Sequence, residues 1–69
     1  MNINWHKGFK VAFTIEDKQG KLSANKEGLI SLAHQLLDLA QEKNGCHIHY
    51  DINNSLEDNS AELIIEKYD

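Results

Sequence analysis

Residues 25–45, NKEGLISLAHQLLDLAQEKNG, decide the predicted fold of this chain. Apolar residues recur in it every three or four positions, which is the period of one face of an α-helix. Asn25 is a favourable N-cap, and Gly45 follows the polar end of the stretch as a left-handed stop, so we expect a helix to about Lys43. The face expected to pack on the core consists of Leu29, Leu32, Ala33, Leu36, Leu39 and Ala40.

Three segments around this helix alternate apolar and polar residues, as half-buried strands do. They are Phe9–Glu16, Cys46–Tyr50 and Ala61–Tyr68. The polar residues 17–20 are predicted to form a turn, and residues 21–24 an irregular connection to the helix.

The order strand, helix, strand, strand predicts an α+β fold of the β-α-β-β type. We expect a three-stranded, mostly antiparallel sheet with the helix packed on one face and the other face open. With 69 residues, the chain is expected to form one small domain, residues 1–69. Trp5 is expected to fold back and cover Ile30 and Leu37 on the flank of the helix.

Composition restricts the classes of function. Seven Lys, no Arg and 11 acidic residues give a formal charge of −4, which disfavours binding to nucleic acid because phosphates are held by clustered cations. A chain this short has little room for a deep active-site cavity, so we expect no enzyme and no cofactor. The single cysteine, Cys46, and the absence of a long apolar run favour a cytoplasmic protein without a membrane segment.

A pair of histidines is the sharpest local feature of the sequence. His47, His49 and Asp51 alternate with apolar residues on a predicted strand, so their side chains share one side. With Glu62 or Glu66 they could form a His/carboxylate metal site, but two histidines at this spacing are a weak signal. Solvated polar residues on an open sheet face, or residues in contact with a partner, are the favoured interpretations. We therefore predict neither a metal site nor a catalytic residue.

Several short runs together resemble a known family. Asn25–Leu29, His47–His49, and Leu56 with Asn59–Ile65 resemble immunity family thirty-two of bacterial polymorphic toxin systems, over roughly Asn25–Glu66. The resemblance implies a small α+β immunity protein in the bacterial cytoplasm that binds and neutralises a cognate toxin. It supplies no toxin-contacting residues that could be transferred to this sequence.

The leading hypothesis is a non-enzymatic protein-binding module whose partner is a protein such as a basic toxin domain, because an acidic surface would steer a basic partner. The alternative is a small interaction domain that forms a homodimer through its open sheet face or edge, so a monomer and a homodimer both remain open. The predicted binding surface is the open sheet face with the adjacent loop: His47, His49, Asp51, Glu57, Asp58, Glu62, Ile64 and Glu66.

Overall fold

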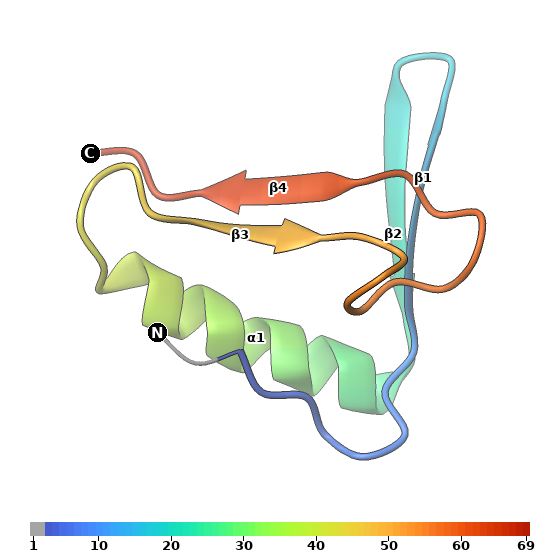
Figure 1. Cartoon of the computed structure of the whole chain (residues 1–69), viewed down its shortest axis with the longest axis horizontal. Helices are drawn as coiled ribbons and strands as arrows, with labels where there is room; N and C mark the ends of the chain where they lie inside the picture. Colours follow the sequence, from blue (N-terminus) through green and yellow to red (C-terminus); the bar gives the residue numbers. More distant parts are fainter. Residues whose placement is uncertain (1–2) are drawn as a thin grey trace.

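A computed structural model describes residues 3–69 and confirms the α+β class (Figure 1). Its elements, in chain order, are β1 (Val11–Glu16), β2 (Gln19–Ala24), α1 (Lys26–Ala40), β3 (His47–Tyr50) and β4 (Leu63–Glu66). The helix and three of the four strands therefore lie where the sequence pattern predicts them. The helix ends three residues earlier than expected, at Ala40, and each predicted strand is shorter at one or both ends.

The predicted three-stranded sheet is wrong, because the strands form two separate antiparallel pairs, β1 with β2 and β3 with β4. The cause is the turn after β1. Asp17 and Lys18 both have positive φ, 49° and 68°, as the two central residues of a tight hairpin turn require. Glu16 therefore pairs directly with Gln19, and residues 19–24 form a strand where the end of the turn (residues 19–20) and an irregular connection (residues 21–24) are predicted from the sequence.

The segment that leads into β4 occupies the edge of β1 that a third strand would need. The N–H groups of Glu57 and Ala61 donate to the carbonyl oxygens of Val11 and Phe13, at 2.8 and 2.7 Å. Ser60 adds a side-chain contact, since its Oγ accepts from the Phe13 N–H at 3.2 Å. The two hairpins are thus joined through a loop, and the β1–β2 hairpin crosses the direction of β3 and β4 (Figure 1).

The first turn of α1 is fixed to the segment before β1. Asn25 is the N-cap, as predicted, and its Oδ1 accepts from the N–H groups of both Gly28 and Lys10 at 2.9 Å. Gly28 allows a close approach, because an added Cβ there would lie 2.7 Å from the Lys10 carbonyl oxygen and 2.8 Å from Cγ2 of Val11. The cap and the glycine together position the helix against β1.

The predicted inner face of α1 is only partly right. The buried helix residues are Gly28, Ser31, Leu32, Gln35 and Leu39, so the helix is rolled relative to the expected face. Ser31 and Gln35 turn inward because both have partners in the N-terminal segment. The His6 N–H donates to Ser31 Oγ at 2.8 Å, and Gln35 Nε2 donates to the Asn4 carbonyl oxygen at 2.9 Å.

The hydrophobic core lies between α1 and the β3–β4 hairpin and extends to β1. Its buried members are Val11, Leu32, Leu39, Ile48, Tyr50 and Leu56. Trp5 folds back onto this core, where it stacks on Phe9 with ring centroids 4.2 Å apart. It does not cover the flank of the helix as predicted, because Ile30 and Leu37 remain exposed.

Candidate functional site

The outward face of the β3–β4 hairpin gathers most of the predicted binding residues. In β3, Ile48 and Tyr50 are buried, so the alternating side chains of His47 and His49 point outward. The antiparallel register places His47 opposite Glu66 and His49 opposite Ile64. With Glu62, which directly precedes β4, these side chains form what we call the sheet face: His47, His49, Glu62, Ile64 and Glu66.

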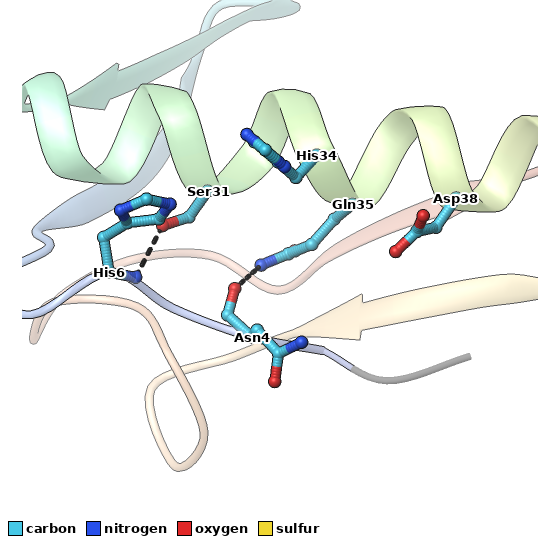
Figure 2. A pocket seen from close by; sticks show the side chains of 6 residues that line it. All are labelled: Asn4, His6, Ser31, His34, Gln35 and Asp38. Carbon is cyan, nitrogen blue, oxygen red and sulfur yellow. Dashed lines mark hydrogen bonds between the residues drawn. The ribbon is translucent and has the colours of Figure 1, made fainter.

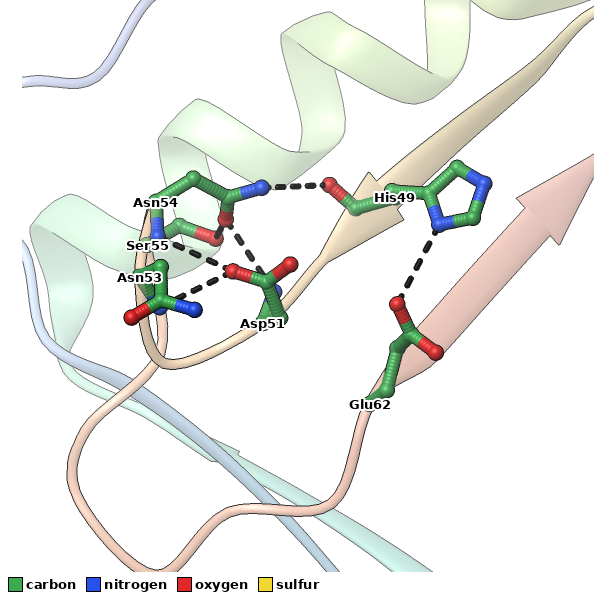
Figure 3. A network of polar contacts seen from close by, with 6 residues as sticks. All are labelled: His49, Asp51, Asn53, Asn54, Ser55 and Glu62. Atoms are coloured by element: carbon green, nitrogen blue, oxygen red, sulfur yellow. Dashed lines mark hydrogen bonds and ion pairs between the residues drawn. The ribbon is translucent and has the colours of Figure 1, made fainter.

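Both histidines of the sheet face are oriented by a hydrogen bond at Nδ1. His49 Nδ1 lies 3.3 Å from Glu62 Oε2 (Figure 3), and His47 Nδ1 lies 3.2 Å from the carbonyl oxygen of Gly45. The side chains of His49 and Glu62 are about half exposed, 47% and 55%. An exposed pair of this kind contributes little to stability. These groups are therefore available at the surface, and their orientation is defined.

Asp51 belongs to the loop that follows β3. Its Oδ1 accepts from the N–H groups of Asn53 and Asn54 at 2.9 and 3.1 Å, which closes an Asx turn (Figure 3). The Asn54 side chain then donates from Nδ2 to the His49 carbonyl oxygen at 3.1 Å. The Asp51 carboxylate thus shapes the end of β3 and is separate from the His49–Glu62 contact.

Glu57 and Asp58 are exposed but lie toward the other hairpin. The N–H of Glu57 donates to the carbonyl oxygen of Val11, and Glu57 lines a groove together with Lys10 and Asn25. The structure therefore gathers five of the eight predicted residues on the sheet face and places Asp51, Glu57 and Asp58 along the loop beside it.

A second surface that the sequence interpretation missed is the outward side of α1. Leu37 and Leu29 are 66% and 54% exposed there. We call this surface the helix face; it comprises Leu29, Ile30, Ala33, Leu36, Leu37 and Ala40. The sequence contains a signal for it, because the large apolar residues of the helix cover about half of its circumference, which is wider than the stripe that one packing contact needs, and Ser31 and Gln35 lie just beyond one edge of this apolar arc.

Two polar side chains, Tyr50 and Gln35, are buried beneath the sheet face. The buried Tyr50 hydroxyl donates to Gln35 Oε1 at 2.8 Å, and burial raises the pKa of Tyr50 above its ordinary value of 10.0. With the bond from Gln35 to Asn4, this network connects β3, α1 and the N-terminal segment. Its groups have partners, so the polar atoms stabilise one arrangement of the helix.

The recess between the N-terminal segment and α1 is small (Figure 2). Its volume is about 120 Å³, and its lining residues are Asn4, His6, Ser31, His34, Gln35 and Asp38. Pockets for drug-sized ligands occupy about 300–1,000 Å³. In residues 3–69, no group of three or more His, Cys, Asp and Glu side chains could hold a metal ion. Larger hollows of about 330, 410 and 610 Å³ lie elsewhere on the surface, and the first of them is lined by His49 and Tyr50 beside the sheet face.

One helix with two separate β-hairpins defines a small α+β protein. Residues 21–68 match the family described as Immunity protein 32, and the chain belongs to that family. The match extends from β2 to the residues after β4 and confirms the resemblance found in the sequence. No curated protein and no solved structure matches the chain. None of the helices in the described part of the chain is long and apolar enough to span a membrane.

Proposed function

We propose that this protein is an immunity protein that neutralises a cognate toxin by binding it, without catalysis of its own. The observation that carries the proposal is membership of the Immunity protein 32 family over more than half of the chain. An inhibitor that binds by surface contact needs an exposed surface with defined side chains, and the sheet face provides one.

We infer that the toxin contacts the sheet face and the adjacent loop with Asp51, Glu57 and Asp58. Glu62 and Glu66 flank Ile64 on this face, and Ile64 is half exposed. An exposed apolar side chain with charged neighbours has the arrangement of an interface core and its polar rim. The carboxylates, on a chain of formal charge −4, favour a basic partner and would accelerate its association.

The direct test of the function uses the protein encoded by the adjacent gene. That protein is expressed alone and together with this full chain, and growth and co-purification are measured. We expect growth to be inhibited by the neighbour alone, rescued by co-expression, and accompanied by a stable complex. A toxic neighbour that neither binds this chain nor is rescued by it would contradict the proposal.

The contact surface is tested with two double variants of equal net charge. Glu62→Lys with Glu66→Lys reverses two charges on the sheet face, while Glu16→Lys with Asp38→Lys reverses two exposed charges elsewhere. We expect the first pair to slow association with the toxin at least about tenfold and the second pair to have a much smaller effect. Equal effects of the two pairs would show that net charge alone matters and would exclude the sheet face as the specific contact.

The alternative function, self-association through the sheet face or a strand edge, is tested on the same protein. Sedimentation at two concentrations distinguishes a monomer from a homodimer. A homodimer whose formation is abolished by the Glu62→Lys and Glu66→Lys pair would favour self-association as the role of this face.

A further inference from the structure

The histidine pair on the sheet face has a geometry that binding of a protein partner does not require. We propose that His47 and His49 form a two-histidine chelate for a borderline divalent transition metal ion such as Zn²⁺ or Ni²⁺. Imidazole nitrogens are preferred ligands of these ions, whereas Mg²⁺ and Ca²⁺ prefer oxygen. The proposal concerns the isolated chain and is independent of any toxin.

The two rings are oriented by the hydrogen bonds at their Nδ1 atoms. His47 Nδ1 contacts the carbonyl oxygen of Gly45, and His49 Nδ1 contacts a carboxylate oxygen of Glu62. Both of these oxygen atoms can only accept a hydrogen bond. Nδ1 therefore carries the proton in both rings, and in a neutral imidazole the lone pair is then on Nε2. Ligating histidines commonly have this arrangement, in which a backbone carbonyl or a carboxylate holds the nitrogen that does not bind the metal.

The two rings also lie close together. Their centroids lie 5.0 Å apart, with an angle of 65° between the ring planes. A Zn–N bond of about 2.0–2.1 Å puts the centre of a bound imidazole about 3.2 Å from the metal, so two imidazoles in tetrahedral coordination have centres about 5.2 Å apart. The observed centroid separation is close to this value, and positions 47 and 49 keep both rings on one side of β3.

The number of protein ligands determines the kind of metal site that is proposed. Because residues 3–69 contain no group of three or more suitable side chains, the chain supplies two ligands and solvent completes the coordination. Glu66, opposite His47 in the register, and Glu62 contribute negative charge near the bound cation. Such a site is open and exchangeable, unlike a structural zinc site with four protein ligands.

The chain contains another close pair of histidines that serves as an internal comparison. The rings of His6 and His34 lie 5.8 Å apart, on the N-terminal segment and on α1. This pair spans two separate elements, whereas His47 and His49 are held on one strand. Specific binding at β3 must therefore leave the His6–His34 pair unaffected.

The test is a titration of the full, isotopically labelled chain with ZnCl₂ and, separately, with MgCl₂. We expect Zn²⁺ to shift the imidazole nitrogen resonances of His47 and His49, and these shifts to saturate at one ion per chain. The resonances of His6 and His34 should stay unchanged. Mg²⁺ should shift none of the four. We further expect His47→Gln or His49→Gln to weaken Zn²⁺ binding at least about tenfold, and Glu62→Ala to weaken it by about tenfold. His34→Gln should change it less than twofold.

Both β3 histidines are exposed, so their Gln variants are expected to fold, and thermal unfolding checks this. Shifts centred on His6 and His34, or Zn²⁺ affinity retained in His47→Gln and His49→Gln, would overturn the proposal. The titration contains no partner protein, so a chain that does not bind Zn²⁺ would not contradict the toxin-binding proposal. Likewise, a chain that does not bind the toxin would not contradict the proposed metal site.

Discussion

The helix face and the sheet face are both exposed, yet they differ in chemistry. The helix face consists of leucine, isoleucine and alanine, and its most exposed large side chain is Leu37. The sheet face surrounds one apolar residue, Ile64, with two histidines and two glutamates. Charged groups can orient and accelerate an approaching partner, whereas an exposed apolar patch contributes only once it is buried. This difference is the reason for proposing the sheet face, and not the helix face, as the contact surface for a basic partner.

The same comparison shows why apolar periodicity alone does not identify the core side of a helix. Leu29 and Leu36 fit the predicted inner stripe, yet they are exposed, while Ser31 and Gln35 are buried and hydrogen-bonded. Polar partners on the N-terminal segment and a close approach at Gly28 select the observed orientation.

The largest expected effect distinguishes the inner from the outer side of α1. Leu32→Ala removes a buried side chain and is expected to lower the free energy of unfolding by about 2–5 kcal/mol. Leu37→Ala, on the helix face, is expected to change it by less than about 0.5 kcal/mol. Urea denaturation of the two variants measures both values. Equal losses would mean that the helix orientation described here is wrong.

A smaller effect is expected at the contact between α1 and β1. Gly28→Ala places a methyl group within 2.8 Å of Lys10 and Val11, so we expect a loss of about 1–3 kcal/mol from overpacking. The matched control is Ala33→Gly on the helix face. It should lower the free energy of unfolding by about 0.5–1 kcal/mol, because glycine has a lower helix propensity than alanine. If Gly28→Ala instead stabilises the protein in thermal unfolding, the close approach does not exist in solution.

Tyr50, on the buried side of β3, provides the third test. Tyr50→Phe leaves Gln35 Oε1 without its donor and is expected to cost about 1–2 kcal/mol at neutral pH. Because burial raises the pKa of Tyr50, its contribution to stability is present below pH 10.0 and is lost as the pH rises through the higher pKa of the folded state. The variant should therefore lose less stability than the parent above pH 10.

The control for this effect is Tyr68→Phe, since Tyr68 is exposed near the end of the chain. It should leave both the stability at neutral pH and its decrease at alkaline pH nearly unchanged. A Tyr50→Phe variant with the same alkaline profile as the parent would contradict the assignment of that decrease to Tyr50.

The parts of the fold that were predictable depend on local chemistry. Asn25 identifies the start of the helix, and alternation in residues 46–50 and 61–68 identifies β3 and β4. The hairpin of β1 and β2 was missed because Asp17 and Lys18 adopt left-handed conformations that the sequence favours only weakly. The orientation of the helix was missed because it depends on contacts of Ser31 with His6 and of Gln35 with Asn4, which are 25 and 31 residues apart in the sequence.

Some positions of the candidate site were also predictable from the local pattern, and others were not. Alternation alone places His47, His49 and Ile64 on one outward face, as the register confirms. The positions of Asp51 and Glu57 depend on the path of the loop between β3 and β4, which is set by an Asx turn and by hydrogen bonds to β1. A local sequence pattern does not predict such long-range contacts. The positions of these loop residues relative to the sheet face could therefore be determined only from the structure.

The central claim, that the toxin binds the sheet face, is tested most directly by mapping the bound surface. Amide resonances of the labelled chain are compared before and after addition of the protein encoded by the adjacent gene. The largest shifts are predicted in residues 45–66, with His47, His49 and Ile64 among them and little change in the outward residues of α1. Shifts concentrated at Leu29, Ile30 and Leu37, with β3 and β4 unchanged, would contradict the claim and assign binding to the helix face.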